Sequence, residues 1–200
     1  MYRKRRSGRY CLVVIFATAL LLGACTNDRP WHLHDLSGLM PPLQFTLTDG
    51  DGQTVHANKY RGKVILLYFG YTHCPDVCPT TLARLAKAVA TLGTGASSVR
   101  VLFISVDPKR DRPATLRSYC RYFGPQFVGL SGTDKELRTL TKRYRVTYST
   151  GTPNANGDYE VTHSSAVFIF DTKANIRLLA TYQATGDAIA ADLQRLLAEG

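Results

Sequence analysis

Two short, almost wholly apolar runs constrain the fold of this 200-residue chain more than any other feature. Residues 63–69 (KVILLYF) and 99–106 (VRVLFISV) are rich in β-branched and aromatic residues, which is typical of strands buried on both faces. Between them, from Pro79 to Val89, apolar residues recur at helical spacing. A buried strand, a helix and a second buried strand predict parallel strands joined by a right-handed crossover.

The same alternation of strand and helix patterns continues toward the C-terminus. Further strands are expected at residues 127–130, 165–170 and 176–182, and further helices at residues 113–122, from Thr133 to about Tyr144 and from about Asp187 to Leu197. Before the first buried strand, the alternating residues 43–47 and a turn at 49–52 (DGDG) predict a hairpin. This order predicts one α/β domain, a thioredoxin-like three-layer sandwich with an N-terminal β-hairpin and one additional helix.

Basic residues are concentrated at the N-terminus rather than along the folded part. The chain has 25 Lys and Arg against 15 Asp and Glu, and five of the basic residues precede residue 25, where no acidic residue occurs. The remainder contains no long basic run and no RNP-type motif, so nucleic acid is not expected as a partner. Five cysteines in 200 residues are also too few for a disulfide-stapled scaffold.

The first 25 residues are typical of an export signal. Residues 11–24 form an apolar run of the length of a signal-peptide core (~7–15 residues), shorter than the ~20 residues that cross a bilayer. The run ends Leu22-Gly23-Ala24-Cys25, which resembles a bacterial lipobox and implies cleavage before Cys25 and diacylation of its thiol. An uncleaved anchor and an ordinary secretory signal are the alternatives.

We therefore expect a lipoprotein-type signal peptide at residues 1–24, a tether at 25–40 and a folded domain at 41–200. A chain anchored in the membrane by lipid is expected in the cell envelope, with its domain facing the periplasm or another extracytoplasmic side. Such a compartment is oxidising, which bears on the remaining thiols.

Three cysteines remain in the folded part, and an odd number favours chemistry over stapling. Cys74 and Cys78 join the first buried strand to the helix that follows, and a helix N-terminus lowers the pKa of a thiol. If helical geometry extends across them, their Cβ atoms lie ~5–6 Å apart, which suits a shared metal or, after a small adjustment, a disulfide. Two buried cysteines acting as small apolar side chains are the alternative. Cys120, inside a helical stretch, is either an inert core thiol or a resolving thiol.

Soft thiolates favour Cu(I), zinc or iron–sulfur clusters, and an added imidazole still suits copper and zinc. His163 closely precedes the strand at 165–170, in the loop that a thioredoxin-like sheet places opposite the N-terminus of the first helix. Thioredoxins have a cis-proline there, so we expect His163 beside the two cysteines, with a solvated loop histidine as the alternative. His73 is a weaker ligand candidate because adjacent residues on a tight turn point apart. The other histidines, His32, His34 and His56, are expected at the surface.

Three motifs together resemble the Sco family (Sco/SenC/PrrC). They are Cys74-x-x-x-Cys78-Pro79, a strand that ends in Asp107-Pro108, and Thr162-His163-Ser164. The resemblance covers about residues 40–198. Cys-x-x-x-Cys alone is a weak signal, but the combination is specific.

The resemblance implies a membrane-tethered thioredoxin-like protein that assists the assembly of cytochrome c oxidase. It implies that Cys74, Cys78 and His163 bind copper, as Cu(I) or Cu(II), and that the domain carries copper or electrons to the binuclear copper centre of the oxidase. The expected partner is the copper-bearing subunit of the oxidase or another copper chaperone. The two cysteines also form a redox dithiol, and Asp76 matches a family aspartate that tunes the thiols or assists docking. A lipobox in place of the transmembrane helix of many members is a departure from the family pattern.

Other functions are weighed against the same residues. A peroxiredoxin-type peroxidase is excluded because neither Cys74 nor Cys78 has Thr or Ser three residues before it, or Pro seven residues before it. A general extracytoplasmic thiol–disulfide oxidoreductase stays open, and it predicts that His163 is dispensable for turnover. A copper or redox sensor also stays open. Met-rich copper transfer is disfavoured because the chain has two methionines.

Overall fold

An eight-stranded mixed sheet lies at the centre of the computed structural model, which describes residues 30–200. The strands are β1 (His34–Asp35), β2 (Thr46–Asp49), β3 (Thr54–His56), β4 (Val64–Gly70), β5 (Val99–Ser105), β6 (Phe127–Ser131), β9 (Val167–Phe170) and β10 (Ile176–Ala180), in the spatial order β1-β10-β9-β4-β5-β6-β2-β3. Strands β4, β5 and β6 are parallel, and the neighbours on both sides pair with them antiparallel. A separate two-stranded sheet pairs β7 (Tyr148–Thr150) with β8 (Val161–His163).

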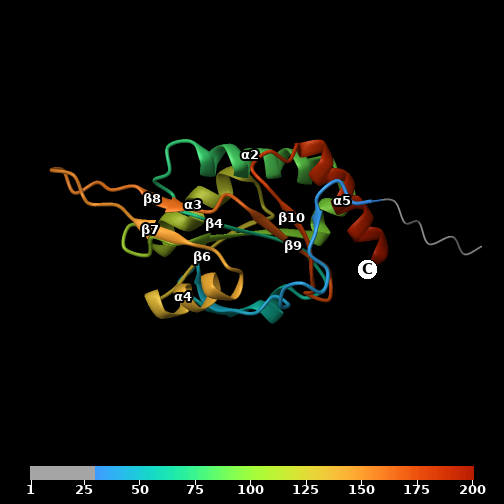
Figure 1. The fold of residues 1–200 in the computed structure, drawn as a ribbon, viewed down its shortest axis with the longest axis horizontal. Helices are drawn as coiled ribbons and strands as arrows, with labels where there is room; N and C mark the ends of the chain where they lie inside the picture. The colour runs from blue at the N-terminus through green and yellow to red at the C-terminus, as the bar shows by residue number, and fades with distance from the viewer. Residues whose placement is uncertain (1–29) are drawn as a thin grey trace, which may run out of the picture. The chain divides into compact units, whose positions relative to one another are not determined.

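Helices cover both faces of the large sheet and complete a three-layer sandwich (Figure 1). The α-helices are α2 (Val77–Ala90), α3 (Pro113–Phe123), α4 (Asp134–Arg143) and α5 (Gly186–Glu199), and the 3-10 helices are η1 (Ala57–Tyr60) and η2 (Gly93–Ser98). Helices α2, α3 and α5 lie on one face and α4 lies on the other. The domain therefore has the predicted α/β fold, with the N-terminal hairpin β2–β3 at one edge of the sheet.

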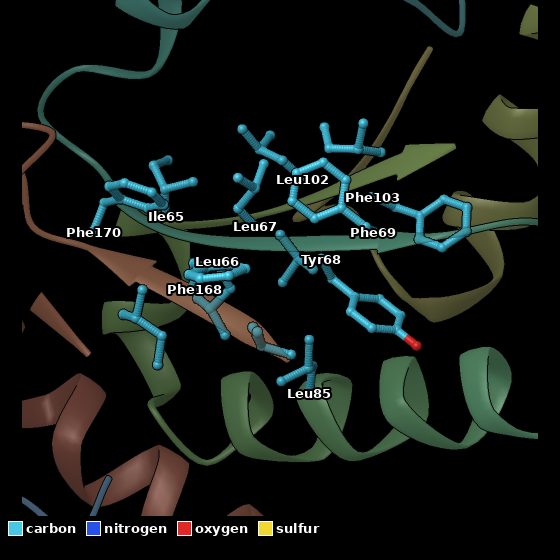
Figure 2. Close-up of a cluster of buried hydrophobic side chains, with 14 of the residues drawn as sticks. Ile65, Leu66, Leu67, Tyr68, Phe69, Leu85, Leu102, Phe103, Phe168 and Phe170 are labelled. Carbon is cyan, nitrogen blue, oxygen red and sulfur yellow. The ribbon is translucent and has the colours of Figure 1, made fainter. Parts of the chain in front are cut away.

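The central strand β4 is buried along its whole length because its side chains alternate between the two layers of helices. Leu66 and Tyr68 face α2, where Leu85 packs against them, whereas Leu67 and Phe69 point to the opposite face (Figure 2). Fully burying each of these large side chains contributes roughly 1.5–3 kcal/mol, so the apolar run that predicts the strand also supplies much of the core.

The helix starts follow the local sequence. The Thr133 side chain accepts a hydrogen bond from the backbone N–H of Glu136, whose carboxylate accepts in return from the backbone N–H of Thr133, forming a capping box for α4. The Thr185 side chain caps α5 by accepting a hydrogen bond from the Ala188 N–H, and Pro113 occupies the first position of α3.

The predicted order of strands and α-helices is confirmed, with two additions. At residues 30–40, which the sequence assigns to the tether, β1 pairs with β10 and Leu33 is buried, so packing against the domain begins before residue 41. The β7–β8 pair is the second addition, and residues 151–160 form the loop between its strands. Neither addition has a strong sequence signal, because β1, β7 and β8 span only two or three residues each.

The predicted signal peptide and the predicted lipidation site at Cys25 lie outside the described residues. Across residues 30–200, none of the helices combines the length and the apolar character that crossing a membrane requires.

Candidate metal centre

Cys74 and Cys78 lie where the central strand β4 gives way to α2. The strand ends at Gly70, a turn follows, and the helix begins at Val77, so Cys78 sits in its first turn and Cys74 precedes it. The backbone N–H of Cys78 donates a hydrogen bond to Cys74 Sγ at 3.4 Å. The two thiols are thus brought together by the turn rather than by a helix that continues through both residues.

His163, the last residue of β8, completes the group. Its Nε2 lies 3.2 Å from Cys78 Sγ, and the three ligand atoms of Cys74, Cys78 and His163 all lie within 4.8 Å of one another. The Nδ1 atom lies 3.0 Å from the backbone carbonyl oxygen of Ser164. When Nδ1–H donates to that carbonyl, the lone pair of Nε2 points toward the thiols, as a metal ligand requires.

Burial controls the protonation of these groups. Cys78 is fully buried, and this raises the pKa of its thiol to about 12, although hydrogen bonds from the Tyr71 backbone and the Tyr68 hydroxyl act in the opposite direction. The expectation that the helix N-terminus lowers the thiol pKa is therefore wrong at Cys78, because desolvation outweighs it. Burial also lowers the pKa of His163, which favours the neutral imidazole. A metal that binds here must displace the Cys78 proton.

Aromatic side chains line the inner side of the group. The Tyr68 hydroxyl donates to Cys78 Sγ at 3.6 Å, and the rings of Tyr68 and Tyr71 meet the His163 ring edge-on at 6.0 Å and 5.9 Å between centroids. A cleft of about 580 Å³ adjoins the turn on the outer side, with Tyr71, Pro75 and residues of the 151–160 loop among its walls. The group is thus closed toward the core and has a cleft beside it.

Gly70 leaves room for Cys78. A Cβ atom at this position would lie 2.8 Å from Cys78 Sγ and 2.6 Å from Cε2 of Phe103, closer than such contacts allow. Glycine is required at this position because the end of strand β4 lies directly against the Cys78 thiol. Sequence reasoning missed this residue, and a glycine at the end of an otherwise bulky run is the signal that points to it.

The buried carboxylate of Asp111 fixes the turn that leads to Cys74. Asp111 accepts hydrogen bonds from the backbone N–H and the hydroxyl group of Thr72, at 2.9 Å and 2.6 Å, and from the Ser105 hydroxyl at 2.6 Å. Sequence reasoning also missed Asp111. Its signal is a second aspartate closely following Asp107 at the carboxyl end of β5, the edge where function gathers in α/β sheets.

The remaining predicted residues lie outside the group. Asp76 is exposed, and one of its carboxylate oxygens accepts a hydrogen bond from the Thr80 hydroxyl at 3.1 Å. His73 is exposed, and its Nδ1 lies 3.5 Å from Asp111 Oδ1. Cys120 is buried in α3, and burial raises the pKa of its thiol to about 12, which fits an inert core thiol. His32, His34 and His56 are exposed, as predicted.

The donor set restricts which metals fit. Two thiol sulfurs and one imidazole nitrogen are soft or borderline ligands, which suit copper and zinc better than magnesium or calcium. Three ligands are one short of the closed four-ligand shell of structural zinc sites. The group therefore fits a metal that keeps a coordination position for an incoming ligand.

Comparison with known proteins agrees with this geometry. The family model described as SCO1/SenC matches residues 42–198, most of the chain. This chain belongs to the SCO1/SenC family. A SCO2-like protein of Rickettsia felis is 35% identical over 173 residues, which cover 80% of this chain and 80% of that relative.

Solved structures of Sco proteins share the fold. Bradyrhizobium japonicum ScoI with copper bound is 38% identical, with a TM-score of 0.71 over 78% of this chain and 98% of that one. Yeast Sco1 with copper bound is 30% identical, with a TM-score of 0.71 over 78% of this chain and 87% of that one.

Proposed function

We propose that this chain binds copper through Cys74, Cys78 and His163 and delivers it during assembly of the binuclear copper centre of cytochrome c oxidase. The observation that carries the proposal is the convergence of two thiols and one imidazole within 4.8 Å from segments 85 residues apart. The copper-bound Sco relatives support the choice of copper over zinc. The receiving partner is the copper-bearing subunit of the oxidase or another copper chaperone.

The geometry suits transfer rather than storage. A three-ligand site leaves a position to which a ligand of the acceptor can bind before the donor ligands leave, so copper moves by ligand exchange through a shared intermediate. The cleft beside the turn is lined by His73 and Pro75, the residues on either side of Cys74, and Cys74 is the more exposed of the two thiols. Asp76 stands exposed at the same turn and is the docking candidate.

The same thiols support a reductase role when copper is absent. Cys74 and Cys78 are free and close enough for a disulfide after a small adjustment. Attack of the Cys74 thiolate on a disulfide of the acceptor, followed by attack of Cys78 on the mixed disulfide, would pass two electrons to the acceptor and leave Cys74–Cys78 oxidised. A general thiol–disulfide oxidoreductase and a copper or redox sensor are the alternatives, and both leave copper transfer aside.

We also propose the location predicted from the N-terminal sequence. Residues 1–24 act as a signal peptide, Cys25 carries the lipid, and the folded domain faces the periplasm or another extracytoplasmic side. Metabolic labelling with a radioactive fatty acid tests this, since a Cys25→Ser variant loses the label only if the cysteine is the acylated residue.

Copper titration tests the function itself. The reduced protein is titrated with Cu(I) and, separately, with Cu(II), beside His163→Ala and the matched control His73→Ala. We expect one equivalent of each ion and a thiolate–copper charge-transfer band. His163→Ala should retain Cu(I) on two thiolates and lose most of its Cu(II) affinity, because the imidazole satisfies the harder ion. No saturable binding by the fully reduced protein would favour the general oxidoreductase.

A further inference from the structure

His163 lies at the end of a two-stranded segment, residues 148–163, which we call the arm and which is separate from the large sheet. In the described part of the chain, β7 and β8 pair with each other, and Tyr148 of β7 stands opposite His163 of β8. The joining residues 151–160 are almost all exposed, and Figure 1 shows them reaching out from the body of the domain. The position of the imidazole therefore depends on what holds the arm in place.

A cluster of three residues, which we call the latch, ties the arm to the loop after β5. It consists of Asp107, Arg110 and Tyr159. The Tyr159 hydroxyl donates to Asp107 Oδ1 at 2.7 Å, and Arg110 Nε donates to Asp107 Oδ2 at 2.5 Å. The Asp107 carboxylate is almost fully buried, at 3% exposure, so both bonds form where the local dielectric strengthens them.

Arg110 extends the latch to the cysteine turn. Its guanidinium carbon lies 3.6 Å from the centroid of the Tyr159 ring and 5.7 Å from that of Tyr71, which is within the range of cation–π contact for both. The Tyr71 ring in turn meets the His163 ring edge-on. Arg110 thus stands between the arm and the turn, and Tyr159 lies two residues before the start of β8.

The latch side chains contact the arm that carries His163 and the Tyr71 ring, but they do not contact either thiol. Within residues 30–200, the hydrogen bonds and cation–π contacts of the Asp107, Arg110 and Tyr159 side chains are with one another and with Tyr71, and none is with Cys74 or Cys78. A displaced arm would move His163 without moving the turn that carries Cys74 and Cys78.

We propose that Arg110 and Tyr159 are positioning residues that hold His163 against the thiols and thereby set the affinity of the site for Cu(II). Cu(I) is satisfied by two thiolates, so its binding does not depend on the latch. The inference rests on the proposed copper site. It means that two residues that do not touch the metal control how strongly the site binds Cu(II).

The test compares Tyr159→Phe and Arg110→Gln with the control Tyr122→Phe, whose tyrosine is 86% exposed. Both latch variants should bind one equivalent of Cu(I) with wild-type affinity. Their Cu(II) affinity should fall by ~10–100-fold, the usual effect of removing a group that orients a ligand, and nitrogen coupling in the electron paramagnetic resonance spectrum should weaken. The control should match the wild type throughout.

Two results would overturn the inference. One is Cu(II) affinity and nitrogen coupling at wild-type level in both latch variants. The other is an equal loss of Cu(I) and Cu(II), which would assign the latch to general folding rather than to His163.

A metal-free readout separates this inference from the proposed function. In the reduced protein without copper, the ¹⁵N shifts of the His163 ring report whether Nδ1 keeps its proton against the Ser164 carbonyl. We expect the fixed tautomer in the wild type and an averaged, solvated ring in the latch variants. If the wild type binds no copper, the proposed function fails, and unchanged ring shifts in the variants would still contradict the latch.

Discussion

Asp111 and Thr72 join two loops of the domain through both oxygens of one carboxylate. The Thr72 backbone N–H donates to Oδ2 at 2.9 Å and its hydroxyl donates to Oδ1 at 2.6 Å, across 39 residues of chain. Thr72 lies two residues before Cys74, so this pair fixes the turn that presents the first thiol. The Asp111 carboxylate is buried, which makes the pairing costly to break.

Replacing Asp111 should therefore weaken both the fold and the site. We expect Asp111→Ala to lower the free energy of unfolding by roughly 1–3 kcal/mol, because the half-buried donors of Thr72 and the buried hydroxyl of Ser105 lose their acceptor. Urea unfolding of the metal-free protein measures the change. Asp51→Ala, at an exposed carboxylate, is the control and should stay within ~0.5 kcal/mol of the wild type. An Asp111 variant as stable as that control would contradict the role assigned here.

A single methyl group at Gly70 should disturb the packing around Cys78. In Gly70→Ala the new Cβ would press on Cys78 Sγ and the Phe103 ring, and overpacking of this kind costs typically ~1–3 kcal/mol. We expect a lower melting temperature and weaker copper binding together. Gly186→Ala is the matched control, because its Cβ would meet nothing nearer than 3.9 Å. Equal copper affinity in both variants would show that Cys78 has more room than the structure indicates.

Each thiol of the pair should be indispensable for copper. Cys74→Ala and Cys78→Ala remove a direct ligand, so we expect a loss of Cu(I) affinity greater than the ~10–100-fold caused by removing an orienting partner. Competition with a Cu(I) chelator measures it. Cys120→Ala removes the third thiol and should keep one equivalent at wild-type affinity. Wild-type binding by either variant of the pair would overturn the assignment of the ligands.

The free energy of unfolding should depend on the buried Cys120 thiol of α3 at alkaline pH. Burial, with a further contribution from the charge of Asp111, raises the pKa of Cys120 from 9.0 to about 12. The folded state holds this proton more tightly than the unfolded state, so the stability that the thiol contributes is complete below pH 9 and is lost as the pH rises toward 12. Urea unfolding at several pH values should show the stability of the wild type approaching that of Cys120→Ala across this window. A constant difference would mean that the thiol is solvated.

The order of strands and helices could be predicted because it depends on local pattern. Strands buried on both faces need continuous apolar residues, as at 64–70 and 99–105, and helices need an apolar face at their own period. The short strands β1, β7 and β8 were beyond this reasoning, since two or three residues carry no period. Their pairing depends on neighbours that are distant in sequence.

The sequence by itself determined the fold class, the dithiol at a strand–helix junction and the choice of His163 among five histidines. Only the tertiary structure decided the protonation of these groups and the contacts that hold them in place. The pKa of Cys78 is set by burial rather than by its place at a helix start. Asp111 and Asp107 hold the turn and the arm by accepting hydrogen bonds from Thr72 and Tyr159, which lie in distant segments. Desolvation and hydrogen bonding between distant segments arise only when the chain has folded, so residue spacing alone cannot predict them.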